Sequence, residues 1–400
     1  MSQVREGYKQ TKVGVIPLDW DVVKLNEITN YVDYRGKTPT KTSSGIFLVT
    51  AKNIKKGYID YESSKEYVNV NDYSNVMSRG LPKINDVLLT TEAPLGNVAQ
   101  VNNINIALAQ RVIKFRAQEN LDNTYLKYHF LSDIFQWYLY RMAIGTTVLG
   151  IQGKILHKMQ IPLPHIKEQE KIAKILTAWD SAISKQVELI KVRQENKKGL
   201  MQKLLSGEIR FDGFNGEWEI VKLEKIVNCF DNKRVPISKI ERQKIKGDIP
   251  YYGSTSIVDY INDYIFDDDL VLVSEDGGYF YDFNTKPIAF YITGKSWINN
   301  HAHIIKNKDD SLDLKYLYFS LVHKDITSFL NGGTRAKLNK KELLLLKIKL
   351  PSLKEQKKIA EVLTIAEQKI ELLKTELTEL QEQKKALMQK LLTGEIRVKV

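Results

Sequence analysis

A stretch of about 50 residues occurs twice in this chain, and this repeat constrains the fold more than any other feature. Residues 161–211 align with residues 348–398 without insertion or deletion, at an offset of about 187 residues, and about half of the aligned positions are identical. The first copy opens with LPHIKEQEKIAKILT and closes with KKGLMQKLLSGEIRF, whereas the second opens with LPSLKEQKKIAEVLT and closes with KKALMQKLLTGEIRV. One structural unit therefore occurs twice, which predicts near two-fold internal symmetry and a target or partner that also has two halves.

Both copies have the pattern of long coiled-coil helices, with apolar residues at alternating steps of three and four. The second copy keeps this pattern over more than four heptads and breaks it only at Lys384, whereas the first has a polar middle at Gln186, Arg193 and Lys197. The predicted seam comprises Ile172, Leu176, Trp179, Ile183, Ile190, Leu200 and Leu204 in the first copy, and Ile359, Leu363, Ala366, Ile370, Leu373, Leu377, Leu380, Leu387 and Leu391 in the second. We expect the two helices to pair antiparallel, because a whole domain lies between them. The polar middle either sets the register, leaves a gap where something docks, or is simply exposed.

The regions outside the repeats have the pattern of mixed α/β domains. Short β-branched and aromatic runs, such as IFLVT, DVLLTT and DLVLVSEDGG, alternate with turn signals. Both regions begin alike, at WDVVKL (20–25) and WEIVKL (218–223), and GTT at 145–147 matches GGT at 332–334 at the offset of the helices. We therefore predict an α+β protein with a first globular domain (1–164), a central helix (165–211), a second globular domain (212–350) and a C-terminal helix (351–400). The frames are duplicated, and their contents have diverged.

Composition narrows the class of protein. The hydrophobic share of 43% and the charged share of 27% are typical of a globular protein. No apolar run reaches about 18 residues, and the first residues lack the apolar stretch of a signal peptide. The single cysteine, Cys229, fits a reducing compartment, so we expect a cytoplasmic protein without contact to a membrane. The net charge of +12 favours a phosphate backbone, an acidic lipid or an acidic protein as partner.

Motifs for catalysis are weak or missing. Gly294-Lys295-Ser296 is similar to the end of a phosphate-binding loop, but Ala289 stands where the first glycine belongs. His301 and His303, with Glu275 and Asp276 nearby, form a possible metal-ligand set, but no further His or Cys cluster supports it. Neither an Asn/Asp-Pro-Pro-aromatic methyltransferase motif nor a convincing metal-dependent nuclease pattern occurs. The pattern favours a non-catalytic protein without catalytic residues, metal or bound cofactor.

The plan as a whole resembles the specificity (S) subunit of type I restriction–modification systems. The resemblance rests on Tyr8-Lys9, GVIP at 14–17 with Trp20, P-x-x-x-E-Q-x-x-I-A-x-x-L at 164–176 and 351–363, and L-x-G-E-I-R at 205–210 and 392–397. IPYYGS at 249–254, EDG at 275–277 and NNHAH at 299–303 are also similar to such domains.

The resemblance implies two target-recognition domains that each read one half of a split double-stranded DNA site. It implies an antiparallel coiled coil that holds them apart and docks two adenine-methylating modification subunits. Restriction subunits with translocase and nuclease activity join that assembly, and S-adenosylmethionine, ATP and magnesium are expected on the partner subunits. The alternative from another class is a coiled-coil scaffold that docks other proteins without sequence-specific DNA reading.

Polar and basic residues in turns are the candidates for DNA contacts, because base edges and phosphates are read by such side chains. In the first domain they are Tyr34, Arg35, Lys37, Thr38, Lys52, Asn53, Lys55, Lys56 and Arg79. In the second domain they are Tyr251, Tyr252, Ser254, Lys295, Trp297, Asn299, Asn300, His301, Thr334 and Arg335. Each of them is alternatively a solvated turn residue or part of a buried polar network.

Overall fold

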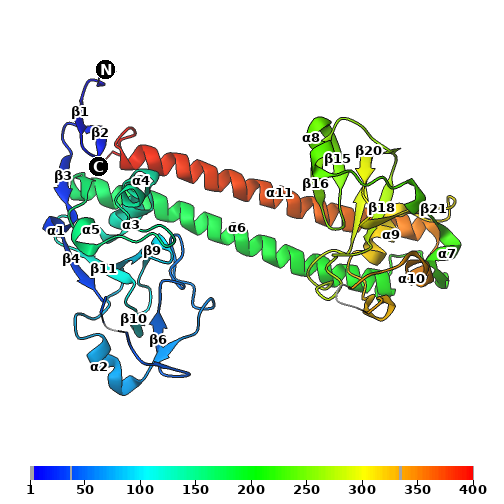
Figure 1. The fold of residues 1–400 in the computed structure, drawn as a ribbon, viewed down its shortest axis with the longest axis horizontal. Coiled ribbons are helices and arrows are strands. Elements are labelled where there is room, and N and C mark those ends of the chain that lie inside the picture. Colours follow the sequence, from blue (N-terminus) through cyan, green and yellow to red (C-terminus); the bar gives the residue numbers. More distant parts are fainter. Residues whose placement is uncertain (1–3, 37, 333–335, 400) are drawn as a thin grey trace. The chain divides into compact units, whose positions relative to one another are not determined.

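The structure, a computed structural model, describes residues 4–36, 38–332 and 336–399. It divides into two compact units, which we call unit 1 (Met1–Val187 with Glu376–Val400) and unit 2 (Glu188–Thr375). Two long helices, α6 (Ile166–Ser206) and α11 (Leu353–Leu392), each contribute one part to each unit (Figure 1). The predicted fold class, mixed α and β with two domains and two long helices, is confirmed. The sequence predicted four consecutive segments, with each long helix as a segment of its own. In the structure each long helix is instead shared between the two units, because the two helices pair with each other.

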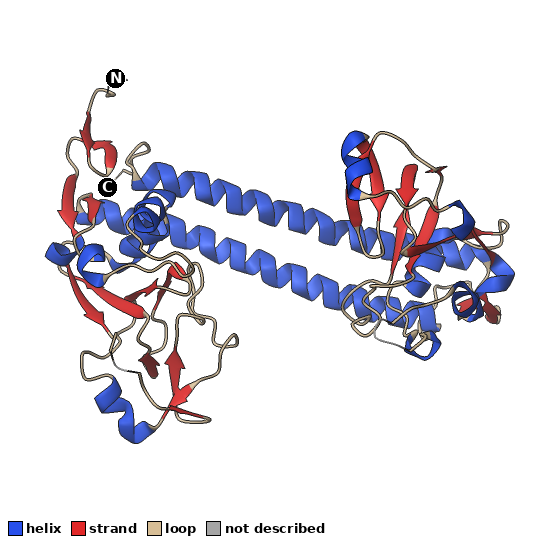
Figure 2. Ribbon diagram, viewed as in Figure 1, coloured by secondary structure: helices blue, strands red, loops and turns tan. Residues whose placement is uncertain are grey.

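Among its described residues, unit 1 contains two four-stranded sheets and two smaller ones (Figure 2). The sheet orders are β4-β11-β8-β9, β10-β6-β7-β5, β1-β2 and β12-β3. The strands are β1 (Tyr8–Thr11), β2 (Gly14–Pro17), β3 (Asp21–Lys24), β4 (Thr29–Asp33), β5 (Lys41–Thr42), β6 (Ile46–Val49), β7 (Tyr67–Val68), β8 (Val87–Thr91), β9 (Leu95–Gln100), β10 (Ile106–Leu108), β11 (Val112–Ala117) and β12 (Gln160–Leu163). The short helices are α1 (Leu25–Ile28), α2 (Tyr73–Val76), α3 (Asn123–Leu131), α4 (Asp133–Arg141) and α5 (Gly153–Leu156).

Unit 2 has the sheet orders β14-β21-β18-β19, β16-β15-β20-β17 and β13-β22. Its strands are β13 (Glu219–Lys222), β14 (Val227–Cys229), β15 (Lys246–Tyr252), β16 (Ile257–Ile261), β17 (Phe266–Asp267), β18 (Leu270–Ser274), β19 (Ala289–Ile292), β20 (Lys295–Ile298), β21 (Ala302–Asn307) and β22 (Lys347–Leu350). Its short helices are α7 (Leu223–Ile226), α8 (Lys239–Lys244), α9 (Leu314–Leu321) and α10 (Lys340–Leu345).

The two units repeat one topology. The antiparallel sheet β4-β11-β8-β9 corresponds strand by strand to β14-β21-β18-β19. In the second sheet, one parallel pair is kept, β6 with β10 in unit 1 and β15 with β20 in unit 2. The extra strand is added at opposite edges, since β5 pairs with β7 but β17 pairs with β20. The duplicated frames thus extend into the domains, and their differences lie at the sheet edges.

Each long helix ends in the same way. Gly207 and Gly394 follow the last helical turns with φ of +76° and +71°, in the left-handed region that glycine enters most readily. The amide of Ile209 donates to the carbonyl of Lys203 at 3.3 Å, and the amide of Ile396 donates to that of Lys390 at 3.2 Å. The repeated G-E-I-R motif is therefore a helix C-cap.

The helix pair closes the hydrophobic core of each unit. In unit 1, Ile172 and Leu176 of α6 lie in one buried cluster with Leu391 of α11 and with residues of α3. In unit 2, Leu204 of α6 shares a cluster with Leu363 of α11. The start of one helix meets the end of the other, so the pairing is antiparallel within each unit. All predicted seam residues are buried or half-buried.

Candidate nucleic-acid interface

A glutamate in the first turn of each long helix ties the helix pair to its domain. In unit 1, the Glu168 carboxylate, with 2% of its side chain exposed, accepts hydrogen bonds from Trp20 Nε1 at 3.0 Å and from Arg397 Nε and Nη2 at 2.7 and 2.9 Å. The same cluster in unit 2 consists of Glu355, Trp218 (3.1 Å) and Arg210 (2.8 Å for both bonds). In each case the arginine comes from the end of the other repeat. The start of each copy is thus held by the end of its partner, which explains why these residues are the same in both copies.

The neighbouring glutamine clamps the loop before a short helix. Gln169 donates from Nε2 to the carbonyls of Pro164 and Asn120 at 2.8 and 3.0 Å, and its Oε1 accepts from the amide of Asp122 at 2.9 Å. Asp122 in turn caps α3 by accepting from the amide of Tyr125. In unit 2 the same bonds are made by Gln356 with Pro351, Ser311 and Asp313. The E-Q of the signature motif therefore positions the domain on its helix pair.

Two polar residues of the seam form ion pairs between the helices, whereas Gln186 donates from Nε2 to Glu376 Oε2 at 3.1 Å and Arg193 is exposed. Lys384 bonds to Asp180 in unit 1, and Lys197 Nζ lies 2.5 Å from Glu367 Oε1 in unit 2. The two pairs are equivalent, because Lys384 corresponds to Lys197, and Glu367 to Asp180, at the offset of 187 residues between the repeats. Burial alone raises the pKa of Asp180, but hydrogen bonds from Lys384 and Tyr128 hold it below its usual value. Among the interpretations of the polar middle, these contacts favour a role in register.

In both units, the loops that follow the two parallel strands form one edge of the sheet, which we call the edge; these strands are β6 and β10 in unit 1 and β15 and β20 in unit 2. The amide of Ala109, after β10, donates to the carbonyl of Val49 at the end of β6 (3.0 Å). In unit 2, the amide of Asn299 donates to the carbonyl of Tyr252 in the equivalent place (3.0 Å). The loops after the paired strand ends therefore lie together, and loops at the carboxyl ends of parallel strands are common ligand-binding positions in α/β proteins.

A basic side chain stands at the same place in both edges. Arg111 Nε lies 2.7 Å from Glu92 Oε1 in unit 1, and His301 Nδ1 lies 2.8 Å from Asp276 Oδ1 in unit 2. The backbone confirms the equivalence, because Thr91 and Glu275 donate their amides to the carbonyls of Arg111 and His301. The side chains are 50% and 41% exposed. His301 was a predicted contact, whereas Arg111 was missed, since no motif marks it.

The structure brings several predicted residues of the first domain together. Arg79 donates from Nη1 to the carbonyls of Asp33 and Arg35 at 2.7 and 2.6 Å, so this arginine supports the loop after β4. Thr38 donates its hydroxyl to Gln110 Oε1 at 3.0 Å, next to Arg111. The side chains of Thr38, Lys52, Lys56 and Arg79 are exposed, those of Arg35 and Lys55 are partly buried, and Lys37 lies outside the described residues.

Burial contradicts the predicted DNA contacts at Asn53, Tyr34 and Tyr251. Asn53 is fully buried, its Oδ1 accepting from the amide of Thr50 and its Nδ2 donating to the carbonyls of Asp60 and Ser64. Tyr34 is 1% exposed and donates its hydroxyl to the Gly80 carbonyl. Tyr251 is 2% exposed, and its hydroxyl accepts from the amide of Ile237. These buried side chains hold loops in place and are not exposed for contact with a base edge.

The other predicted residues of the second domain differ in exposure. Lys295 and Asn300 are exposed, whereas Tyr252, Ser254 and Trp297 are partly buried. Trp297 donates Nε1 to the Val235 carbonyl at 2.7 Å, and Lys295 lies over the Tyr264 ring at 4.6 Å from its centroid. Asn299 is buried, and its Oδ1 accepts from the amide of His301. It therefore belongs to a buried polar network, which was the alternative to a DNA contact. Thr334 and Arg335 lie outside the described residues.

The possible metal set is divided between two hydrogen-bonded clusters. His301 turns to Asp276, whereas His303 is buried, with Nδ1 2.6 Å from Asp231 Oδ2 and Nε2 2.8 Å from the Leu338 carbonyl. Cys229, Asp231 and His303 bring their ligand atoms within 4.8 Å of one another. Both nitrogens of His303 already have partners, however. Burial raises the pKa of Asp231, but the bond to His303 outweighs it and lowers that pKa to about 2. The cluster is accounted for by hydrogen bonds that tie β14 to β21.

Comparisons with known proteins agree with the duplicated plan. The family model for the type I restriction modification DNA specificity domain matches residues 17–192 and again residues 215–382. The chain belongs to the type I DNA-specificity family. Specificity subunits of this family are the DNA-recognition components of type I restriction enzymes and are not themselves catalytic. Within the described residues, no helix is both long and apolar enough to cross a membrane.

Relatives resemble the chain over nearly its full length. The MjaVIII specificity subunit of Methanocaldococcus jannaschii is 26% identical over 98% of this chain and 97% of its own length. The putative MjaX specificity subunit of the same organism is 29% identical with the same coverage. The crystal structure of the S subunit from M. genitalium has the same fold, with a TM-score of 0.62 and 18% identity, covering 93% of this chain and 96% of the other.

Proposed function

We propose that each unit reads one half of a bipartite DNA site, and that α6 and α11 set the spacing and dock two adenine-methylating modification subunits. The observation that carries this proposal is the combination of a repeated frame with diverged edges. The Glu–Trp–Arg and Gln clamps are the same in both units, whereas the loops after the parallel strands differ. A constant frame suits two identical partners, and variable loops suit two different half-sites.

Helix length supports the spacing role. The 41 residues of α6 span about 60 Å at 1.5 Å per residue. Half-sites one DNA turn apart are separated by about 34 Å, so a stiff helix pair of this length is long enough to relate them. S-adenosylmethionine, ATP and magnesium bind, in this proposal, to the modification and restriction subunits, and the assembly acts in the cytoplasm.

The first test is methylome sequencing of cells that express the chain with its modification subunit. We expect one split adenine-methylation motif, and no methylation or cleavage by the purified chain alone. Exchanging residues 212–347 with those of a related chain is expected to change one half of the motif only. Methylation without sequence preference would favour the scaffold alternative, and activity of the isolated chain would exclude the proposal.

The equivalent edge positions allow a sharper test. Arg111→Ala is expected to relax or lose one half of the motif, and His301→Ala the other half, because each side chain stands at the reading edge of its own unit. Lys225→Ala, at an exposed position of α7 outside the edge and the long helices, serves as the matched control and should leave both halves unchanged. If both edge variants altered the same half, or neither altered any, the assignment of one half-site to each unit would be wrong.

A further inference from the structure

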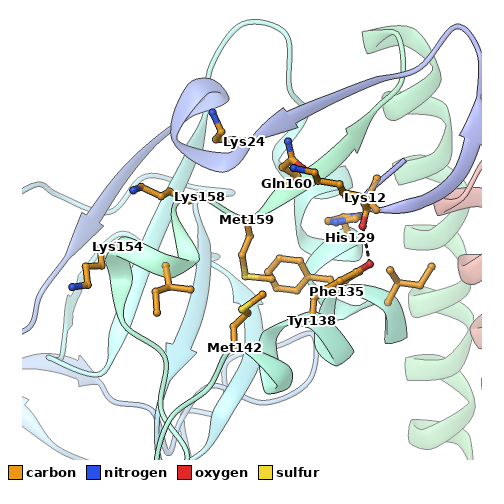
Figure 3. A pocket seen from close by; sticks show the side chains of 13 residues that line it. Lys12, Lys24, His129, Phe135, Tyr138, Met142, Lys154, Lys158, Met159 and Gln160 are labelled. Carbon is orange, nitrogen blue, oxygen red and sulfur yellow. Dashed lines mark hydrogen bonds between the residues drawn. The ribbon is translucent and has the colours of Figure 1, made fainter. Parts of the chain in front are cut away.

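Unit 1 contains a large cavity whose lining includes none of the predicted DNA-contact residues. Its volume is about 720 Å³, and it opens between the β1–β2 hairpin, α4 and α5. Figure 3 shows Phe135, Met142 and Met159 in its middle, with Lys24, Lys154 and Lys158 along one side and Lys12 on the other. Most of the interior is therefore apolar, in a size range typical of sites that bind small groups or side chains.

The rim of the cavity carries charge of one sign. Its lining residues include four lysines, Lys12, Lys24, Lys154 and Lys158, and no carboxylate. Lys24 is paired with Glu27 at 2.9 Å. Within the described part of the chain, no ion pair is recorded for the other three, and their side chains are exposed. Several lysines around an apolar centre attract a ligand with more than one negative charge.

A buried histidine, His129, also lines the cavity. His129 is 5% exposed, and its Nδ1 is buried without a hydrogen-bond partner among the described residues. Burial lowers the pKa of His129 to about 3, so the imidazole is neutral and offers a hydrogen bond at neutral pH. In unit 2, Ser320 occupies the equivalent helix position and donates its hydroxyl to the Tyr316 carbonyl at 2.9 Å, so this feature is not duplicated.

Exposed apolar residues continue from the cavity onto the adjoining surface. Trp137, Tyr140 and Met142 of the α4 segment are 54%, 48% and 47% exposed. Met142 also lines the cavity, and Trp137 and Tyr140 belong to the same segment. Adjoining exposed aromatic and apolar residues of this kind are typical of protein contacts and not of a closed metabolite site.

We propose that this cavity binds an acidic segment of a partner protein, with an apolar side chain inserted between Phe135, Met142 and Met159 and flanking carboxylates on the lysine rim. A segment fits better than a single small anion, because the lysines belong to three different elements around the opening. The site occurs in unit 1 and is built from residues outside the reading edge, so it does not depend on the proposed DNA function.

Methionine methyl groups provide a local readout. The chain has six methionines, of which Met142 and Met159 line the cavity while Met77 and Met201 lie in other cores. With ¹³C-methyl methionine in the full chain, we would titrate the peptide acetyl-Glu-Glu-Leu-Phe-Glu-Glu-amide and its Lys-for-Glu counterpart. The expected result is a shift of the Met142 and Met159 signals by the acidic peptide only. Signals would be assigned with Met142→Leu and Met159→Leu.

Charge reversal tests the rim separately from the fold. Lys154→Glu with Lys158→Glu changes two exposed side chains and is expected to weaken the acidic peptide on the order of tenfold or more at low salt. Lys225→Glu with Lys239→Glu, which reverses two exposed lysines of unit 2, is the matched control and should not change binding. Equal shifts by both peptides, or equal binding by the reversed variant, would overturn the proposal. A duplex DNA that moved these methyl signals where the acidic peptide did not would also overturn it, in favour of nucleic acid.

Discussion

The Glu168 clamp leads to a quantitative prediction about stability. Its carboxylate is 2% exposed and accepts three hydrogen bonds, one from Trp20 and two from Arg397. Glu168→Ala leaves both donors without this partner. Removing one partner of a buried pair costs about 3–5 kcal/mol, and a hydrogen bond to a charged group contributes about 1.5–3 kcal/mol. Arg397 is 40% exposed and keeps its two bonds to Asp19, so we expect a loss of about 2–3 kcal/mol in the free energy of unfolding.

Urea unfolding at 25 °C measures this loss, and thermal unfolding is expected to show a decrease in Tm of roughly 4–12 °C for a unit of this size. Glu170→Ala, two positions along the same helix and exposed, is the matched control and should change stability by less than about 0.5 kcal/mol. A double-mutant cycle with Arg397→Ala isolates the pair. If Glu168→Ala behaved like Glu170→Ala, or if the cycle showed no coupling, the clamp would not join the helix end to its domain.

Three further predictions concern other features. Gly207→Ala forces a side chain into φ +76° and should lower stability by about 1–2 kcal/mol, whereas Gly199→Ala, within α6 and with open space at its Cβ position, should raise it by up to about 1 kcal/mol; equal effects in thermal unfolding would argue against the C-cap. Burial lowers the pKa of His129 to about 3 and of His157 to about 4, below the unfolded value of about 6.5, so the unfolded state takes up protons first and stability should fall as pH drops from 6.5 to 4. Urea midpoints that stay constant or rise over this range would contradict that assignment. Lys56→Glu, at an exposed loop position, should weaken DNA binding by the assembled complex for all sequences alike and reduce the salt dependence of log K by about 1–2; a change restricted to one sequence would indicate base reading instead.

The helical seam could be predicted residue by residue because a heptad pattern is local. Each predicted seam position is at least half-buried. Even the exception at Lys384 has a reason, since its charge meets Asp180 of the other helix. Helix boundaries also followed from local signals, a proline before each start and a glycine after each end.

The edge at the ends of the parallel strands was harder to predict, because alternation within a strand decides which side chain faces the core. Tyr251 and Tyr252 are neighbours of one type, yet Tyr251 is buried and Tyr252 is partly exposed. Asn53 is a polar residue in a loop, as a DNA contact would be, but its side chain makes four hydrogen bonds that hold the loop together. Arg111 carries no motif, and only the pairing of β6 with β10 places it at the edge.

The sequence by itself determined that one frame occurs twice, that two long helices pair, and that the duplicated parts are separated by diverged domains. These properties follow from repetition and periodicity, which depend on residues close together in the chain. Only the tertiary structure decided that Glu168 binds Arg397 while Glu355 binds Arg210, so that each copy is completed by the other. It also decided which loops share an edge and where unit 1 encloses a cavity. Those outcomes depend on contacts between residues more than 100 positions apart, and a local pattern does not encode which distant partner a charged or polar group will meet.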